Sequence, residues 1–168
     1  MPKMPMLLVA MSMLVSPSLY AADDYTLGPD SHAKEGVPKG TVHKGTFTSP
    51  KIYQGTVRDY WVYVPRQYDG SRPACVMVFQ DGQRFVSDNG HSRVPVVFDN
   101  LIHQGDMPVT VGIFLNPGEV PPATDGGKPR RNRSFEYDTL SDQYARFLLA
   151  EVLPYVTDKY KLKMTTNP

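Results

Sequence analysis

The sequence has one cysteine, almost no net charge and no apolar run long enough to span a bilayer. Cys75 has no second cysteine to pair with, so stability must come from a packed core rather than from an internal disulfide. The 18 basic and 17 acidic residues leave a formal net charge of +1, which excludes the basic excess of nucleic-acid binders. The longest apolar run, residues 6–15, is half the roughly 20 residues that a membrane-spanning helix needs.

Motifs that hold nucleotides or metals are also missing. Neither Gly-x-Gly-x-x-Gly nor the phosphate-binding loop ending in Gly-Lys-Ser/Thr occurs, and no two histidines stand four residues apart. A metal site could be drawn from scattered carboxylates and one histidine, but their spacing matches no known ligand motif. We therefore expect no metal and no other cofactor. The residues of that rejected site are Asp81, Asp88, His91 and Asp99.

Residues 1–21 have the layout of a secretory signal peptide. Lys3 precedes the apolar run, and small residues follow it. We expect cleavage after Ala21, with Ala22 as the alternative site, and a secreted or periplasmic product without a membrane segment. A retained anchor is the competing interpretation. Residues 22–44 are polar and rich in glycine and proline, which indicates a flexible leader before a domain over residues 45–168.

The domain begins with an expected antiparallel hairpin. Gly45–Ile52 and Val57–Val64 are rich in β-branched and aromatic residues, and Tyr53–Thr56 has the character of a turn. The uniformly apolar Ala74–Phe79 is typical of a buried strand in a parallel sheet, with Cys75 as a small buried hydrophobe.

A parallel crossover should follow this strand. We expect a helix over Pro95–His103 and a second buried strand over Val109–Leu115. After a long loop over residues 116–133, one apolar face repeats along Ser141–Tyr160, which predicts a helix with Ser141 as N-cap and a kink at Pro154. The fold class is therefore α/β, with a hairpin followed by a parallel βαβα succession.

Two segments invite a catalytic interpretation at the carboxyl ends of the expected strands. Asp81-Gly82 directly follows the first buried strand, where a turn can direct backbone N–H groups into a cleft, although Asp-Gly is also a common turn. Arg133-Ser-Phe-Glu136-Tyr137-Asp follows the long loop on the same side. Its arginine and glutamate either pair locally or contact a substrate.

Ser92 is a poor candidate for a nucleophile. Gly90-His-Ser92 resembles the start of the Gly-x-Ser-x-Gly elbow, but Val94 stands where the second glycine is required. No buried strand leads into Gly90, so a solvated loop is the better interpretation.

In order along the chain, several segments resemble the putative esterase family, which includes esterase D and enterochelin-esterase-like proteins. The most specific are the Arg-Ser-x-Glu-Tyr-Asp segment that starts at Arg133 and the Glu-x-Leu-Pro segment that starts at Glu151. The resemblance extends from about Gly45 to Lys163. The supporting segments are Tyr60-Trp-Val-Tyr-Val-Pro65, Val78-Phe-Gln-Asp-Gly82, Asp99-Asn-Leu-Ile102, Asn116-Pro-Gly118 and Tyr144-Ala-Arg-Phe147.

The resemblance implies the N-terminal part of an α/β-hydrolase fold, truncated before the strand that carries the nucleophile. The family's serine, acidic residue and histidine would then all lie beyond Pro168, and the chain alone should be inactive. The resemblance also implies a serine esterase in complete form, acting on a sugar ester, a feruloyl ester or a siderophore-class ester, and the expected signal peptide implies that it is exported. It nominates Gly82 and Gln83 for the oxyanion hole, and Asp81, Arg133, Glu136 and Tyr137 for the substrate cleft.

Two other functions compete with this interpretation. The first is a non-catalytic exported module that binds a carbohydrate or siderophore through the aromatic side chains of Tyr60, Trp61 and Tyr137. The second is a metal-dependent hydrolase. The sequence does not identify the ester or the oligomeric state.

Overall fold

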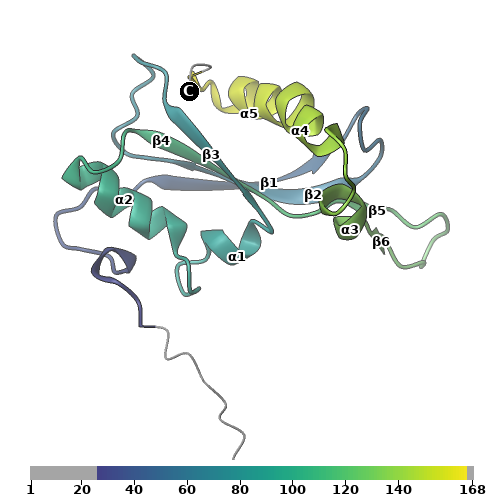
Figure 1. Ribbon diagram of the computed structural model, residues 1–168, viewed down its shortest axis with the longest axis horizontal. Coiled ribbons are helices and arrows are strands. Elements are labelled where there is room, and N and C mark those ends of the chain that lie inside the picture. Colours follow the sequence, from purple (N-terminus) through teal and green to yellow (C-terminus); the bar gives the residue numbers. More distant parts are fainter. Residues whose placement is uncertain (1–25, 166–168) are drawn as a thin grey trace, which may run out of the picture.

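A long antiparallel hairpin starts the sheet in the computed structural model, which describes residues 26–165 (Figure 1). Strand β1 (Thr41–Thr48) pairs with β2 (Val57–Val64), so that Thr41 faces Val64 and Thr48 faces Val57. The prediction of a first strand over Gly45–Ile52 is wrong by four residues. The chain turns at Ser49 because its N–H donates to the carbonyl oxygen of Thr56 at 3.0 Å. The expected signal peptide lies outside the described residues.

The predicted parallel crossover is confirmed. β3 (Cys75–Gln80) is parallel to β4 (Thr110–Leu115), and β4 pairs antiparallel with β2. The connection contains a short helix α1 (Gln83–Val86), which was not predicted, and α2 (Val94–Gln104), whose predicted bounds are within one residue at each end. The main sheet thus has the order β1-β2-β4-β3, in which a parallel pair follows the hairpin.

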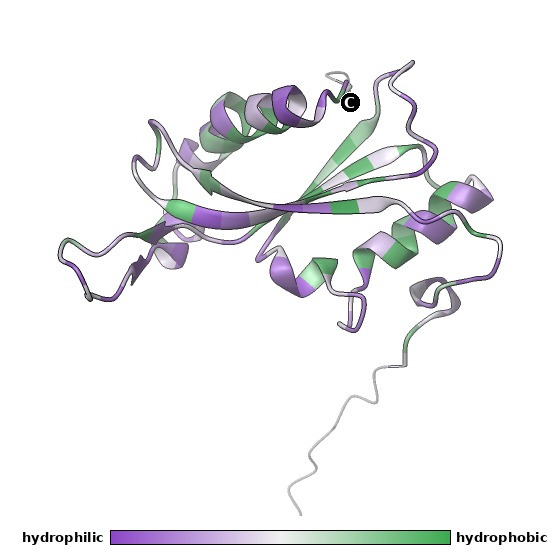
Figure 2. Ribbon diagram, turned by 180° about the vertical axis from the view of Figure 1, so that it is seen from behind, coloured by the Kyte–Doolittle hydropathy of each residue, from purple (hydrophilic) through white to green (hydrophobic). Residues whose placement is uncertain are grey.

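Alternation along β2 separates two cores on opposite faces of the sheet. Tyr60 and Val62 pack against the C-terminal helices, whereas Trp61 and Tyr63 pack against α2. Both layers are visible in Figure 1, and the green segments of Figure 2 show the apolar stretches of sheet and helices. The sheet is therefore covered on both sides, as the bulky residues on both faces of β2 predict.

β3 differs from the predicted buried strand. Within residues 26–165 it lies at the edge of the sheet and pairs with β4 alone among the strands, apart from a parallel bridge between Ala74, just before it, and Met164; its residues are half-buried or exposed. Met77 is 43% exposed. Cys75 is half-buried and carries a free thiol rather than filling the core. An apolar run alone does not distinguish an edge strand from a central one, since both can consist of the same residues.

The segment before β1 packs against α2. It contains a short 3-10 turn, η1 (Pro29–Ser31). Asn100 Nδ2 donates to the carbonyl oxygens of Asp30 and His32 at 2.8 and 2.9 Å. The N–H of Gly40 and the hydroxyl of Tyr63 both donate to Asp99 Oδ1 at 2.7 Å. Burial raises the pKa of this carboxyl. Residues 26–40, expected to belong to a flexible leader, thus make specific contacts with the helix.

After β4, the chain pairs with the start of β2 before it forms the helices that cover the second face of the sheet. A two-stranded ribbon of β5 (Glu119–Val120) and β6 (Arg130–Arg131) lies beside β2 and leads into α3 (Arg133–Tyr137). Across the described residues, no helix is both long enough and apolar enough to cross a membrane.

The predicted last helix is divided into three parts: α4 (Gln143–Phe147), a π-helical turn η2 (Leu148–Val152) and α5 (Leu153–Tyr160). Pro154 stands at the start of α5, where it cannot donate the hydrogen bond of a regular helix, and the wider turn precedes it. The prediction of Ser141 as N-cap is wrong by one residue, because α4 begins at Gln143 and Asp142 is its N-cap, although Ser141 Oγ accepts from the N–H of Gln143 at 3.3 Å.

Candidate active-site cleft

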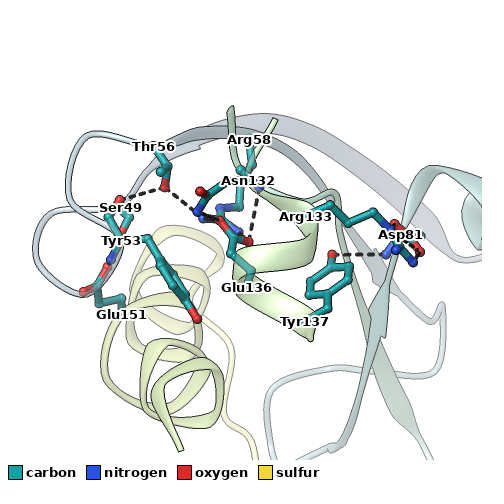
Figure 3. Close-up of polar contacts among 11 residues, drawn as sticks. Ser49, Tyr53, Thr56, Arg58, Asp81, Asn132, Arg133, Glu136, Tyr137 and Glu151 are labelled. Atoms are coloured by element: carbon teal, nitrogen blue, oxygen red, sulfur yellow. Dashed lines mark hydrogen bonds and ion pairs between the residues drawn. The ribbon is translucent and has the colours of Figure 1, made fainter. Parts of the chain in front are cut away.

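A fully buried ion pair lies behind the carboxyl ends of the parallel strands. Arg58 of β2 and Glu136 of α3 have no exposed side-chain surface. The guanidinium donates from Nη1 to Oε2 at 2.7 Å and from Nη2 to Oε1 at 3.0 Å (Figure 3). Such a two-pronged pair is directional as well as strong. It joins the start of β2 to a helix that is 78 residues further along the chain.

The remaining hydrogen bonds of the pair come from the surrounding loops. Glu136 also accepts from Asn132 Nδ2 at 3.0 Å and from the backbone N–H of Gly118 at 3.2 Å. Arg58 donates to Thr56 Oγ1 at 3.0 Å, and its guanidinium lies 4.3 Å from the ring centre of Phe147. Because a buried charge is tolerated only when its partners are in place, these contacts hold both ends of the long loop.

The turn after β3 brings a backbone amide to the same edge of the sheet. Asp81 has a left-handed backbone with φ of 52°, and Gly82 and Gln83 follow. The N–H of Gly82 donates to the carbonyl oxygen of Leu115 at 2.9 Å and is therefore committed to the sheet. The N–H of Gln83 donates to the side-chain oxygen of Asn116 at 3.1 Å. Of the two predicted oxyanion donors, only Gln83 can be released by a side-chain movement.

Arg133 contacts Asp81 rather than Glu136. Its Nε and Nη2 atoms donate to the carboxylate at 3.0 and 2.7 Å, and its guanidinium lies 5.1 Å from the ring centre of Tyr137. The Arg133 guanidinium lowers the pKa of Asp81, whereas burial raises the pKa of Tyr137. The alternative of a local Arg133–Glu136 pair is wrong, because the first turn of α3 directs the two side chains to different partners.

These residues border an open cleft of about 490 Å³. Asp81, Gln83 and Arg133 line it, whereas Glu136 is 2% exposed and supports the cleft from behind. The N–H of Asp81 donates to the hydroxyl of Tyr137 at 3.4 Å, which places this half-buried ring beside the turn (Figure 3). The other lining residues are Arg84, Asn116, Pro117, Gly118, Glu119 and Arg131.

Arg58 and Asn116 are not among the site residues predicted from the sequence. Arg58 shares a face of β2 with Tyr60 and Val62, so its position on a core-facing face could have indicated a buried charge. Asn116 is the first residue after β4, at the same sheet edge as Asp81. Its position after a parallel strand was the available signal.

Other candidate residues do not meet in this cleft. Tyr60 and Trp61 are 1% and 8% exposed and point to opposite faces of the sheet, so the predicted aromatic binding surface with Tyr137 does not form. Ser92 lies in the loop before α2. Among residues 26–165, no three His, Cys, Asp or Glu side chains are arranged to hold a metal ion.

A second cavity, of about 290 Å³, lies between residues 31–42 and the start of α2. It is lined by both acidic and basic side chains, including Asp88, Asp99 and Arg93. We place the candidate chemistry in the larger cleft instead, because that cleft lies at the carboxyl ends of parallel strands, where α/β proteins bind their ligands.

Comparison with known proteins shows which family and which solved structures this chain resembles. Residues 54–167 match the family described as putative esterase. The CE1 ferulic acid esterase of Anaeromyces mucronatus, solved with ferulic acid, is 19% identical with a TM-score of 0.53 and aligns with 83% of this chain. The feruloyl esterase module of Clostridium thermocellum, complexed with sinapinate, is 16% identical with a TM-score of 0.52 and aligns with 85%.

The alignments cover 48% and 44% of those two structures, so this chain spans just under half of their length. At these identities the likeness establishes the fold, that of the α/β-hydrolases. No curated protein matches the chain.

Replacing Glu136 by glutamine should leave the Arg58 charge buried without its counterion. We expect Glu136→Gln to lower the free energy of unfolding by about 3–5 kcal/mol, measured by urea denaturation. The matched control is Arg133→Gln, which breaks a more exposed pair with Asp81 and should cost at most about 1 kcal/mol. Equal losses for the two variants would contradict the anchoring role of the buried pair.

Proposed function

From the premise that the chain belongs to the putative esterase family, we propose that it is the N-terminal part of an exported serine esterase. The complete protein would hydrolyse carboxylic esters through an acyl-enzyme. The observation that carries the proposal is the Gln83 amide at the carboxyl edge of the sheet, beside an open cleft. Export rests on the signal-like layout of residues 1–21.

In this proposal, the chain contributes electrostatic stabilisation rather than the nucleophile. The N–H of Gln83 would donate to the carbonyl oxygen of the ester as negative charge develops on it. Asn116 Oδ1 accepts from that N–H and must rotate away first. The backbone N–H of Asn116 donates to the carbonyl oxygen of Asp59 at 3.0 Å, so the side chain can move while the main chain stays in place.

The nucleophile, acid and base would come from a continuation of the chain. The printed sequence has no Gly-x-Ser-x-Gly, and α/β-hydrolases place their triad in the order serine, acid, histidine from that elbow onward. The exposed edge of β3 supports such a continuation, since an apolar edge strand is a ready partner for another strand. We propose that the strand carrying the nucleophile pairs there.

An aromatic acid ester is the first substrate class to test. One structural neighbour was solved with ferulic acid and another with sinapinate. Arg84 and Arg131 line the cleft of this chain and would favour a substrate with a negatively charged or strongly polar group. Sugar esters and siderophore-class esters are the other members of the proposed range.

The assay that tests this function compares two proteins. The 168-residue chain should neither turn over methyl ferulate or p-nitrophenyl acetate nor be labelled by a fluorophosphonate probe, because it lacks the elbow serine. The product of the reading frame extended beyond the Pro168 codon should do both. Labelling of Ser92 in the short chain would contradict its proposed inactivity, and a stop codon directly after Pro168 would contradict the proposed continuation.

Removing the Asn116 amide should free the Gln83 N–H for the substrate. In the extended protein we expect Asn116→Ala to raise kcat/KM by about 2- to 10-fold, the equivalent of one hydrogen bond that no longer has to be broken. Asn89→Ala, at an exposed position in the loop before α2, is the control and should leave kcat/KM unchanged. A lower kcat/KM for Asn116→Ala would show instead that Asn116 positions the turn.

A further inference from the structure

Three tyrosines and one lysine form a cluster between β2 and α5. Lys159 Nζ donates to the hydroxyls of Tyr60 and Tyr155 at 2.8 and 2.9 Å. The hydroxyl of Tyr60 lies 3.0 Å from that of Tyr160 and 3.4 Å from that of Tyr155. The ammonium also lies between 5.2 and 5.7 Å from the three ring centres. One cation is therefore shared among three phenols.

The local sequence builds this cluster from two elements. Tyr155 and Lys159 are four residues apart in α5 and so lie on one face of the helix. Tyr60 reaches them from β2, across Gly45 of β1, which is its partner in the strand register. A Cβ at Gly45 would lie 2.5 Å from the Tyr60 hydroxyl, so the position needs a glycine for the phenol to fit.

The three phenols differ in their surroundings. Tyr60 is 1% exposed, and its burial raises its pKa. Tyr155 is half-buried and lines a surface groove of about 380 Å³ between β1 and the C-terminal helices. The hydrogen bond from Lys159 lowers the pKa of Tyr155. Because Tyr60 and Tyr155 are neighbours and do not readily carry a negative charge together, ionisation of this pair is favoured at Tyr155, the more accessible of the two.

Other charged groups around the groove do not replace Lys159 as the partner of the Tyr155 hydroxyl. Glu151 of η2 lines the groove, but its carboxylate accepts from Ser49 Oγ and from the N–H of Ile52, both at 2.6 Å. Lys51 lines the groove as a further cation. His43 of β1 packs against Tyr160, with the two ring centres 5.0 Å apart.

We infer that Tyr155 is a nucleophilic phenol and the site at which this chain is O-acylated by activated acyl donors. Lys159 stabilises the phenolate, whose oxygen attacks the acyl carbon. The bond from that carbon to the leaving group breaks, the leaving group departs with the electron pair and takes up a proton from water, and a tyrosyl ester remains. The inference is independent of the proposed esterase function, since it uses neither the cleft nor a catalytic serine.

N-acetylimidazole supplies the acyl group in the test. The full 168-residue chain is treated with a limiting amount, and acetylated tyrosines are quantified by peptide mass spectrometry. We expect Tyr155 to react faster than half-buried Tyr68, which lies outside the cluster. In Lys159→Met, which keeps the apolar stem but removes the ammonium, acetylation of Tyr155 should fall by about 10-fold, the equivalent of one charge-assisted hydrogen bond.

Two further variants separate reactivity from folding. Lys161→Met removes a lysine that pairs with Asp158 outside the cluster and should leave the acetylation of Tyr155 unchanged. Lys159→Arg keeps the positive charge and should retain most of the reactivity, even if Lys159→Met proves unstable. The inference is overturned if Tyr155 reacts no faster than Tyr68, or if loss of the charge at residue 159 has no effect in a folded variant.

Discussion

The ion pair between Arg58 and Glu136 holds the second half of the described chain against its first half. Both charges are fully buried, and the carboxylate receives four hydrogen bonds, two from Arg58 of β2, one from Gly118 in the loop after β4 and one from Asn132 just before α3. Removing one charge from a buried pair of this kind is costly, because the charge that remains has lost its hydration. The arrangement therefore specifies one position for α3 and for the loop that precedes it.

That position determines the shape of the cleft. Glu136 is fixed on the inner side of α3, and Arg133, one turn earlier, then reaches Asp81 at the turn after β3. Tyr137 follows Glu136 and contacts the same turn through the N–H of Asp81. The two ion pairs are thus linked through one short helix. The turn that presents the Gln83 amide is held from the side of α3 as well as from the sheet.

Local patterns predicted much of this fold. The apolar runs of β3 and β4, with the helix between them, indicated a parallel crossover, and alternation in β2 indicated a sheet covered on both faces. The resemblance to the putative esterase family, carried by the Arg133 and Glu151 segments, correctly indicated the fold and the family.

Those local patterns could not predict which residues pair when they are far apart in the sequence. The start of β1 depends on which residues face β2, and the edge position of β3 depends on its neighbours in the sheet. The partner of Glu136 is 78 residues away in sequence, whereas proximity in the chain could suggest only Arg133 as a local partner. Whether the Gln83 N–H is free or hydrogen-bonded likewise depends on Asn116, which lies beside it only in the folded sheet.

Native-state hydrogen exchange on the unmodified chain tests the central claim most directly. If the buried pair anchors the loop, the amide protons of Gly118 and Asn132 should exchange only with global unfolding, at the free energy measured for Ile113 in β4. Equal protection at these positions is the result that the anchored loop predicts. Exchange of Gly118 and Asn132 by local opening, at a much lower free energy than Ile113, would contradict it.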